Sequence, residues 1–360
     1  AVVISAIISM ATGSSWTTSA TIGIALVAIG KAIGLPAGMV AGAVISGAYF
    51  GDKMSPLSDT TNLASAMAGT KLFTHIKYMA YTTVPTIIIT LVVFAVLSLT
   101  YQVGDVQGTE QLLAAISTKF NITPWLFVVP LLVIVLIIKK VNPVVALLAG
   151  TLLGCVACLL TQPAILSDFA TMHSTAPNYA FLMQSITQGV AIETSNASLN
   201  DLFSAGGMSG MLGTVWLIIC AMVFGGIMEA IGALARISSA LLSFATSIFG
   251  LFASTVASCL AINLTASDQY LAIVVPGKMF EKAYKDKGLA PENLSRTLED
   301  SGTVTSALIP WNTCGAYQSG VLGVGVSEYI GYAVFNYLSP FMTLIFAAFK
   351  IKIAQFSKKD

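Results

Sequence analysis

Long runs of uninterrupted apolar residues dominate the chain and predict membrane-spanning α-helices. A bilayer core about 30 Å thick needs ~20 residues of helix to cross it. In lipid the backbone polar groups must be satisfied within the segment, which favours helices. The runs are continuous rather than alternating, which argues against a membrane β-barrel. They cover residues 78–100, 125–138, 141–160, 211–234, 241–264 and 329–349.

Composition supports the same fold class. The 360 residues are 56% hydrophobic and 9% charged, whereas soluble domains carry about 25% charged residues. Mean hydropathy is +0.85, and the net charge of +1 gives no indication of a nucleic-acid partner. We therefore predict an all-α integral membrane protein that is not an enzyme and holds no cofactor. Since the chain begins inside an apolar run without Met, we expect N-terminal helices to be missing.

Polar and helix-breaking residues recur at nearly one spacing, which predicts an internal repeat. Residues 12–15 resemble 265–268, at a spacing of 253. Pro36 and Pro291 are 255 apart, as are the Ser-Gly pairs at 46 and 301. Residues 55–60 resemble 309–314, at a spacing of 254, and each of these segments contains a proline.

Basic residues set the predicted orientation, because Lys and Arg concentrate in cytoplasmic loops. The predicted spans from residue 78 to residue 234 alternate correctly if these basic residues lie inside and the acidic loop 162–210 lies outside. The loop holds Asp168, Glu193 and Asp201. The basic residues placed inside are Lys71, Lys77, Lys139, Lys140, Arg236, Lys278, Lys282, Lys285, Lys287, Arg296, Lys350, Lys352, Lys358 and Lys359.

The run at 241–264 and the lysines after it fit this orientation only if a re-entrant hairpin has its tip at residues 265–268. The same logic places a hairpin tip at residues 13–16, entering from the other side. We therefore predict an inverted repeat with two re-entrant hairpins and two proline-broken transmembrane helices, a common design of secondary transporters. The predicted parts are a first repeat at 1–102, two connecting helices and an external loop at 103–210, and a second repeat at 211–360.

The first break, at residues 51–62, places charged groups at membrane depth. An ionised side chain there costs about 2.5–3.5 kcal/mol, so it indicates function. Pro56 interrupts the helix, which exposes carbonyl oxygens and starts a new half-helix. Oxygen ligands beside Asp52 and Asp59 suit a small hard cation. One reading is that Lys53 neutralises Asp52, which leaves Asp59 as the free carboxylate.

The second break and the hairpin tips supply further oxygens. Pro310, Asn312 and Thr313 take the places of Pro56, Ser58 and Asp59. Glu299 and Asp300 begin this segment, and whether they lie at the membrane interface is left open. Gly38-x-x-x-Gly42 is expected to allow close helix packing without a ligand role. His75 and His173 are expected to be surface residues in loops.

The motifs resemble a known family. Residues 50–64, Phe-Gly-Asp-Lys-Met-Ser-Pro-Leu-Ser-Asp-Thr-Thr-Asn-Leu-Ala, closely resemble the signature of NhaC-type sodium/proton antiporters, and residues 12–23, 222–229 and 310–317 are also similar to that family. The resemblance implies a cation-coupled antiporter of the bacterial cytoplasmic (inner) membrane, with hairpins and an inverted repeat. The family also includes malate/lactate exchangers, so it does not fix the substrate.

The predicted mechanism is exchange of Na⁺ for H⁺ by competition at shared carboxylates. A desolvated carboxyl group favours its protonated form, whereas bound Na⁺ favours the ionised form. Asp59 is the first candidate for the shared group and for Na⁺ ligation, followed by Asp52 and Asp268. The other predicted ligands are Ser15, Ser58, Thr60, Asn62, Ser267, Asn312 and Thr313.

Three rival functions stay open. The first is an organic-acid antiporter coupled to Na⁺ or H⁺, in which Lys53 or Lys278 would meet a small carboxylate. The second is an intramembrane aspartyl protease built on Asp52 and another intramembrane aspartate. The third is a channel. A homodimer in the lipid bilayer is a further open expectation.

Overall fold

The computed structural model describes residues 1–101, 114, 116–139, 141, 143–172, 178–192, 200 and 203–356. Glu193, Asp201, Lys140, His173, Lys358 and Lys359 lie outside these residues. The described chain is almost entirely helical, which confirms the predicted class. It divides into two compact units. Unit 1 comprises Ala1–Val27, Ala37–Thr100 and Thr214–Asp360, and unit 2 comprises Ala28–Pro36 and Tyr101–Gly213. The three parts predicted from the sequence stay a prediction, because contacts alone do not show which segments form a repeat.

Unit 2 contains short helices and one small hairpin of strands. Val133 and Ala146 form the buried contact between its two apolar helices, α8 and α9. The Gln162 amide exchanges hydrogen bonds of 3.0 and 2.9 Å with the backbone of Asn121. The elements are η2 (Pro124–Phe127), α8 (Val128–Ile138), α9 (Pro143–Thr161), α10 (Pro163–Met172), α11 (Asn178–Thr187) and the antiparallel pair β1 (Val190–Ala191) and β2 (Ser204–Ala205).

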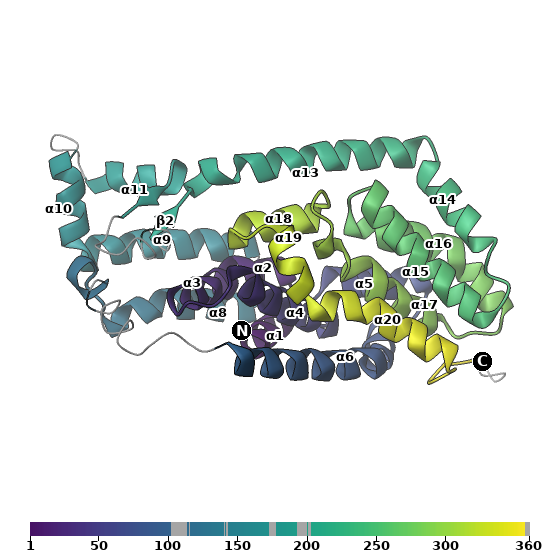
Figure 1. Cartoon of the computed structure of the whole chain (residues 1–360). Coiled ribbons are helices and arrows are strands. Elements are labelled where there is room, and N and C mark those ends of the chain that lie inside the picture. The colour runs from purple at the N-terminus through teal and green to yellow at the C-terminus, as the bar shows by residue number, and fades with distance from the viewer. Residues whose placement is uncertain are drawn as a thin grey trace. The chain divides into compact units, whose positions relative to one another are not determined.

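Unit 1 holds most of the helices labelled in Figure 1. α3 (Ile24–Ala32) and α13 (Gly207–Ala230) run from one unit into the other along the chain. The other elements are α1 (Val2–Thr12), α2 (Ser15–Thr18), η1 (Ser19–Gly23), α4 (Ala37–Met54), α5 (Asp59–Ala68), α6 (Leu72–Thr100), α14 (Ala233–Leu242), α15 (Ile248–Thr265), α16 (Gln269–Asp286), α17 (Pro291–Leu298), η3 (Glu299–Thr303), η4 (Ser306–Leu308), α18 (Thr313–Leu322), α19 (Val326–Tyr329), η5 (Ile330–Tyr332) and α20 (Val334–Ala348).

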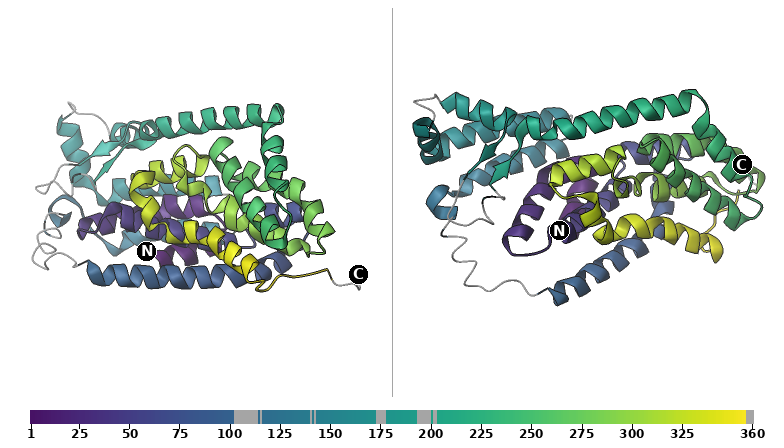
Figure 2. Two further views of the ribbon diagram at one scale, coloured as in Figure 1. Left: turned by 45° about the vertical axis from the view of Figure 1, so that its right-hand side comes forward. Right: turned by 45° about the horizontal axis from the view of Figure 1, so that its top comes forward.

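Both predicted prolines lie at helix breaks. α4 ends at Met54 and α5 begins at Asp59, with Pro56 between them. The second helix runs as α17, η3 and η4 to Leu308, and α18 begins at Thr313, with Pro310 in the gap. Its central piece, η3, is a π-helix, a distortion that often occurs at functional sites. α6 and α20, which follow the two broken helices, each contain a proline, and they lie against one another (Figure 2).

Backbone conformation supports the internal repeat at a single spacing. Residues with positive φ occur at Gly13 and Ser267, at Gly34 and Gly288, and at Gly69 and Gly323. The spacing is 254 in every pair (267 − 13, 288 − 34 and 323 − 69). These positions follow α1 and α15, precede α4 and α17, and end α5 and α18. The same three turns therefore occur in both halves of the chain.

Two hydrogen bonds between helices repeat at the same spacing. The Ser9 hydroxyl donates to the carbonyl of Ala48 at 2.5 Å, and the Asn263 amide donates to the carbonyl of Gly302 at 2.7 Å. Donors and acceptors are each 254 residues apart (263 − 9 and 302 − 48). Each bond ties the helix before a turn to the broken helix that follows. Tertiary packing is thus repeated as well as local structure.

The small-residue motif near the start of α4 packs as predicted. A Cβ atom on Gly38 would lie 2.3 Å from the carbonyl oxygen of Glu328, and one on Gly42 would lie 2.4 Å from Cβ of Tyr332. Both distances are far below contact distance, so α4 meets the α19–η5 segment backbone to backbone. The motif thus lets α4 approach the α19–η5 segment closely.

Among the described residues, three helices are long and apolar enough to cross a membrane: α6, α13 and α15. Two bent pairs, Val145–Thr161 with Pro163–Thr171 and Val326–Tyr332 with Val334–Ala348, would raise the number to five. These helices cover five of the six runs predicted from the sequence; the run at 125–138 forms the shorter pair η2 and α8. The chain is therefore a multi-pass membrane protein.

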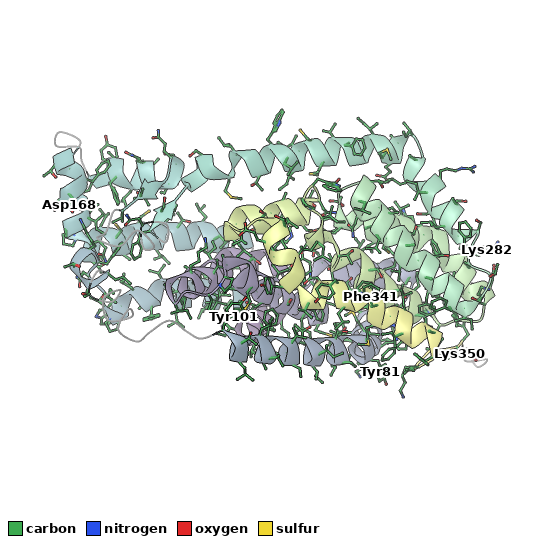
Figure 3. The ribbon with its side chains drawn as sticks, viewed as in Figure 1. Tyr81, Tyr101, Asp168, Lys282, Phe341 and Lys350 are labelled. Atoms are coloured by element: carbon green, nitrogen blue, oxygen red, sulfur yellow. The ribbon has the colours of Figure 1, made fainter. Side chains whose placement is uncertain are left out.

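Basic side chains cluster where α6 begins and α20 ends. Tyr81 and Lys350 lie toward one end of unit 1 in Figure 3, with Lys282 near the end of α16. The Lys352 ammonium lies 5.2 Å above the ring of Tyr81. The Tyr78 hydroxyl contacts the carbonyl of Lys352 and the side-chain amide of Asn293, so it joins α6, α17 and the end of the chain. These contacts hold α17, the first segment of the second broken helix, against α6.

Candidate functional site: buried carboxylates between two broken helices

The first break is held by its own polar side chains. Ser58 is the N-cap of α5, and its hydroxyl accepts a hydrogen bond from the amide of Thr61 at 3.3 Å. The Asn62 amide donates to the carbonyls of Ser58 and Pro56, at 2.6 and 3.1 Å. Asn62 is exposed, and these bonds stabilise the break from its outer side.

Asp52 lies at the end of α4 and meets the first turn. Both the amide and the hydroxyl of Ser15 donate to its Oδ2 atom, at 3.0 and 2.7 Å. Asp52 is only 5% exposed, and its Oδ1 atom has no hydrogen-bond partner among the described residues. The Ser58 hydroxyl also interacts with this carboxylate. The structure thus brings together three predicted site residues, Asp52, Ser15 and Ser58.

Glu299 and Asp300 are both fully buried in η3. Asp300 is surrounded by donors. It forms an ion pair with Lys53, accepts from Thr82 at 2.9 Å and from Ser339 at 3.3 Å, and contacts Thr343. A carboxylate satisfied in this way by α4, α6 and α20 is a structural anchor.

Glu299 has a different environment from its neighbour. Its Oε1 atom accepts from the Thr60 hydroxyl at 3.0 Å, and Thr60 lies 3.1 Å from the Ser58 hydroxyl. Its Oε2 atom has no hydrogen-bond partner in the part of the chain that the structure describes. The charge of Lys53 and, to a smaller extent, that of Asp52 act on Glu299. We define Asp52, Glu299, Ser15, Ser58 and Thr60 as the buried acid cluster.

Lys53 does not neutralise Asp52, as one sequence interpretation held, because its ammonium pairs with Asp300. Asp52 and Glu299 are buried acids that form no ion pair among the described residues. The same pairing removes Lys53 as a partner for a carboxylate substrate, and Lys278 is exposed on α16. His75 is also buried, contrary to expectation, and its Nδ1 atom lies 2.7 Å from the Ser295 hydroxyl.

Asp59 lies outside the buried acid cluster. It is exposed at the start of α5, where its Oδ2 atom accepts from the Tyr270 hydroxyl at 2.6 Å. Asp268 is half-buried and is the N-cap of α16, accepting from the amides of Tyr270 and Leu271 at 2.8 and 3.0 Å. The geometry therefore favours Asp52 over Asp59 and Asp268 as the shared carboxylate.

The second break meets the second turn through neutral groups. Asn312 is the N-cap of α18, accepting from the amide of Cys314 at 3.0 Å and donating to Asn263. The amide of Thr313 donates to the carbonyl of Ser267 at 2.9 Å. The predicted residues Ser267, Asn312 and Thr313 thus lie together, but the contacts recorded for them do not involve Asp52 or Glu299.

Sequence reasoning missed Glu299 as a site residue. The available signal was the pair of adjacent acids, Glu299 and Asp300, shortly before the predicted second break.

The chain is similar to known transporters over most of its length. Residues 47–351 match the model of the Na+/H+ antiporter family. The chain is 36% identical over 349 residues to the Na(+)/H(+) antiporter NhaC of Alkalihalophilus pseudofirmus, covering 97% of this chain and 73% of the relative. It is 37% identical to NhaC of Bacillus subtilis (94% and 73%) and 36% identical to the malate-2H(+)/Na(+)-lactate antiporter of Bacillus subtilis (98% and 71%). No solved structure matches. With a family model spanning most of its length and relatives of this similarity, the chain belongs to the Na+/H+ antiporter family.

Proposed function

We propose that this protein exchanges Na⁺ for H⁺ across the bacterial cytoplasmic membrane by competition at Asp52 and Glu299. The observation that carries the proposal is that each buried carboxylate has one oxygen held by hydroxyl groups and one oxygen without a partner among the described residues. Buried polar atoms are almost always hydrogen-bonded. The unmet oxygens are therefore the natural ligands of a transported cation.

Electrostatics provides the coupling between the two ions. Two nearby carboxylates repel one another when both are ionised. A sodium ion between them allows both to stay ionised, and its departure favours uptake of a proton. Hydroxyl oxygens of Ser15, Ser58 and Thr60 would complete the ligand set, since hard cations prefer oxygen ligands. In this proposal Asp59 and Asp268 lie outside the buried acid cluster and are not the shared carboxylates.

Alternation would come from an inverted repeat in which the two turns are re-entrant hairpins. The repeated turns and hydrogen bonds at a spacing of 254 support a repeat, and inversion is our inference from the distribution of basic residues. Lys31 and Lys285 occupy equivalent exposed positions, since 285 − 31 = 254. Single cysteines at these two positions should react with an impermeant reagent from opposite sides of the membrane; reaction from one side would exclude inversion.

Exchange in everted vesicles tests the site. Asp52→Asn and Glu299→Gln should each lower Na⁺-driven proton flux at least tenfold, while Glu281→Gln, at an exposed acid on α16, should leave it unchanged. A monodisperse elution profile in detergent would show that each variant folds. If Asp52→Asn and Glu299→Gln keep the proton flux of the parent protein and Asp59→Asn loses it, then Asp59 is the shared carboxylate instead.

Exchange of an organic acid stays an alternative, since one relative is described as a malate-2H(+)/Na(+)-lactate antiporter and another, from Halobacterium salinarum, as an arginine/ornithine antiporter. The ion pair between Lys53 and Asp300 makes this alternative weaker, because it occupies one of the two lysines that were candidates to bind a carboxylate substrate. Counterflow of labelled lactate or malate in the same vesicles would distinguish the two.

A further inference from the structure

The N-termini of α5 and α16 are joined by one hydrogen bond between exposed side chains. The Tyr270 hydroxyl donates to Oδ2 of Asp59 at 2.6 Å, and Oδ1 of Asp59 accepts from the amide of Thr60 at 2.8 Å. Tyr270 is 41% exposed and Asp59 is also exposed. Both side chains lie at the surface of the described residues, so the bond can break without leaving a group buried in the protein core unsatisfied.

Thr60, the residue that follows Asp59, belongs to the buried acid cluster. Thr60 is 1% exposed, and its hydroxyl donates to Glu299. α16 runs beside α5, since a Cβ atom on Gly277 would lie 2.8 Å from Cβ of Met67. The carbonyl oxygen of Ala272, in the first turn of α16, lies 3.0 Å from where Gly302 would carry a Cβ. α16 therefore packs against both α5 and η3, which hold the two ends of the Thr60–Glu299 bond.

The turn before α16 has an unfavourable backbone that its contacts hold in place. Ser267 has a φ of 60°. This left-handed conformation is unfavourable in free energy for a residue that carries a side chain. The carbonyl of Ser267 accepts a hydrogen bond from the amide of Thr313. Among the described residues, the hydrogen bond from Tyr270 to Asp59 is the one that joins α16 to α5. On the other side, Trp311 donates to the carbonyl of Leu264 at 2.9 Å, which fixes the end of α15.

From these contacts we infer that the segment Ala266–Tyr270 is a gate, and that the Tyr270–Asp59 hydrogen bond holds it closed beside Thr60 and Glu299. When the bond breaks, the start of α16 moves away from α5 and the cation gains access to the buried acid cluster. Tyr270 is thus a gating residue that acts through the position of α16. The inference rests on the proposed exchange site, because it concerns access to that site.

Chemical accessibility of a reporter cysteine tests the gate without measuring transport. Thr60→Cys places a thiol beside Glu299, and a positively charged methanethiosulfonate reagent measures how fast it is reached. Adding Tyr270→Phe keeps the ring and removes the hydroxyl, and should raise the labelling rate at least threefold. Asp59→Ala removes the acceptor and should have the same effect. Tyr337→Phe, at an exposed tyrosine of α20, is the matched control, and the parent without the reporter gives the background from its five cysteines.

Unchanged labelling in both Tyr270→Phe and Asp59→Ala would overturn the gate, as would an equal rise in Tyr337→Phe. Two independent variants keep the experiment decisive where one fails to fold. Exchange measured on Asp52→Asn and Glu299→Gln separates this outcome from failure of the proposed function. A failed gate leaves exchange dependent on those two acids, whereas a wrong site leaves exchange intact in them whatever the labelling shows.

Discussion

Lys53 and Asp300 form an ion pair in which both side chains are completely buried, and they lie 247 residues apart in the chain. The pair joins the end of α4 to η3, so it connects the two broken helices directly. Thr82, Ser339 and Thr343 surround the same carboxylate. This arrangement satisfies one of the three acids that are buried among the described residues, whereas Asp52 and Glu299 each keep one oxygen without a hydrogen-bond partner there.

Removing one partner of this pair should destabilise the protein. Lys53→Met leaves a buried carboxylate without its counter-charge, which costs about 3–5 kcal/mol. We expect a clear fall in Tm in detergent and a lower yield of monodisperse protein. The double variant Lys53→Met with Asp300→Asn removes both charges and should recover most of the Tm. A single variant as stable as the parent would show that the pair contributes little.

Competition between the two ions predicts a specific dependence on pH. If Na⁺ and H⁺ share one site, a tenfold rise in proton concentration should raise the half-saturating Na⁺ concentration by up to tenfold, with the maximal rate unchanged. Initial rates in vesicles across a grid of pH and Na⁺ would measure this. A pH effect confined to the maximal rate would argue for separate sites.

The two repeated hydrogen bonds should differ in strength in a predictable order. Ser9→Ala removes the hydroxyl that donates to the carbonyl of Ala48, which costs about 0.5–1.5 kcal/mol. Asn263 contacts Gly302, Thr305 and Asn312, so Asn263→Ala should cost more. Thermal unfolding of both variants, beside exposed Ser98→Ala on α6, gives the comparison. An equal Tm for Ser9→Ala and Asn263→Ala would contradict this order.

Close packing at Gly42 should resist any side chain. Gly42→Val would drive its side chain into Tyr332, and overpacking costs about 1–3 kcal/mol. At Gly226 in α13, a Cβ atom would meet no other atom of the described residues within 4 Å. Gly226→Val is therefore the matched control and should change the Tm little. Loss of stability in both variants would trace the effect to valine itself rather than to contact with η5.

Local signals predicted the breaks well. Proline removes a backbone donor, and Ser58 and Asn312 are residue types that cap helices, so the end of α4 and the start of α18 follow from a few neighbouring residues. The repeat was also visible, because equivalent turns need the same small or polar residues. Family membership followed from the long motif around Asp52.

Partner choice could not be predicted in the same way. Lys53 is adjacent to Asp52 in the sequence, but in an α-helix neighbouring side chains point about 100° apart, and the partner of Lys53 comes from the other half of the chain. The burial of His75, Glu299 and Asp300 likewise depends on packing between α6, α17 and α20. The exposed position of Asp59 depends on how α16 lies against α5.

The surroundings of Asp300 constrain which parts of the protein can slide during transport. Four donors from α4, α6 and α20 meet one carboxylate of η3, and separating any of them would strand a charge away from water. These helices must therefore travel together or stay still together. A boundary between a mobile and a stationary body cannot pass through this junction, and has to run where contacts are few and hydrated.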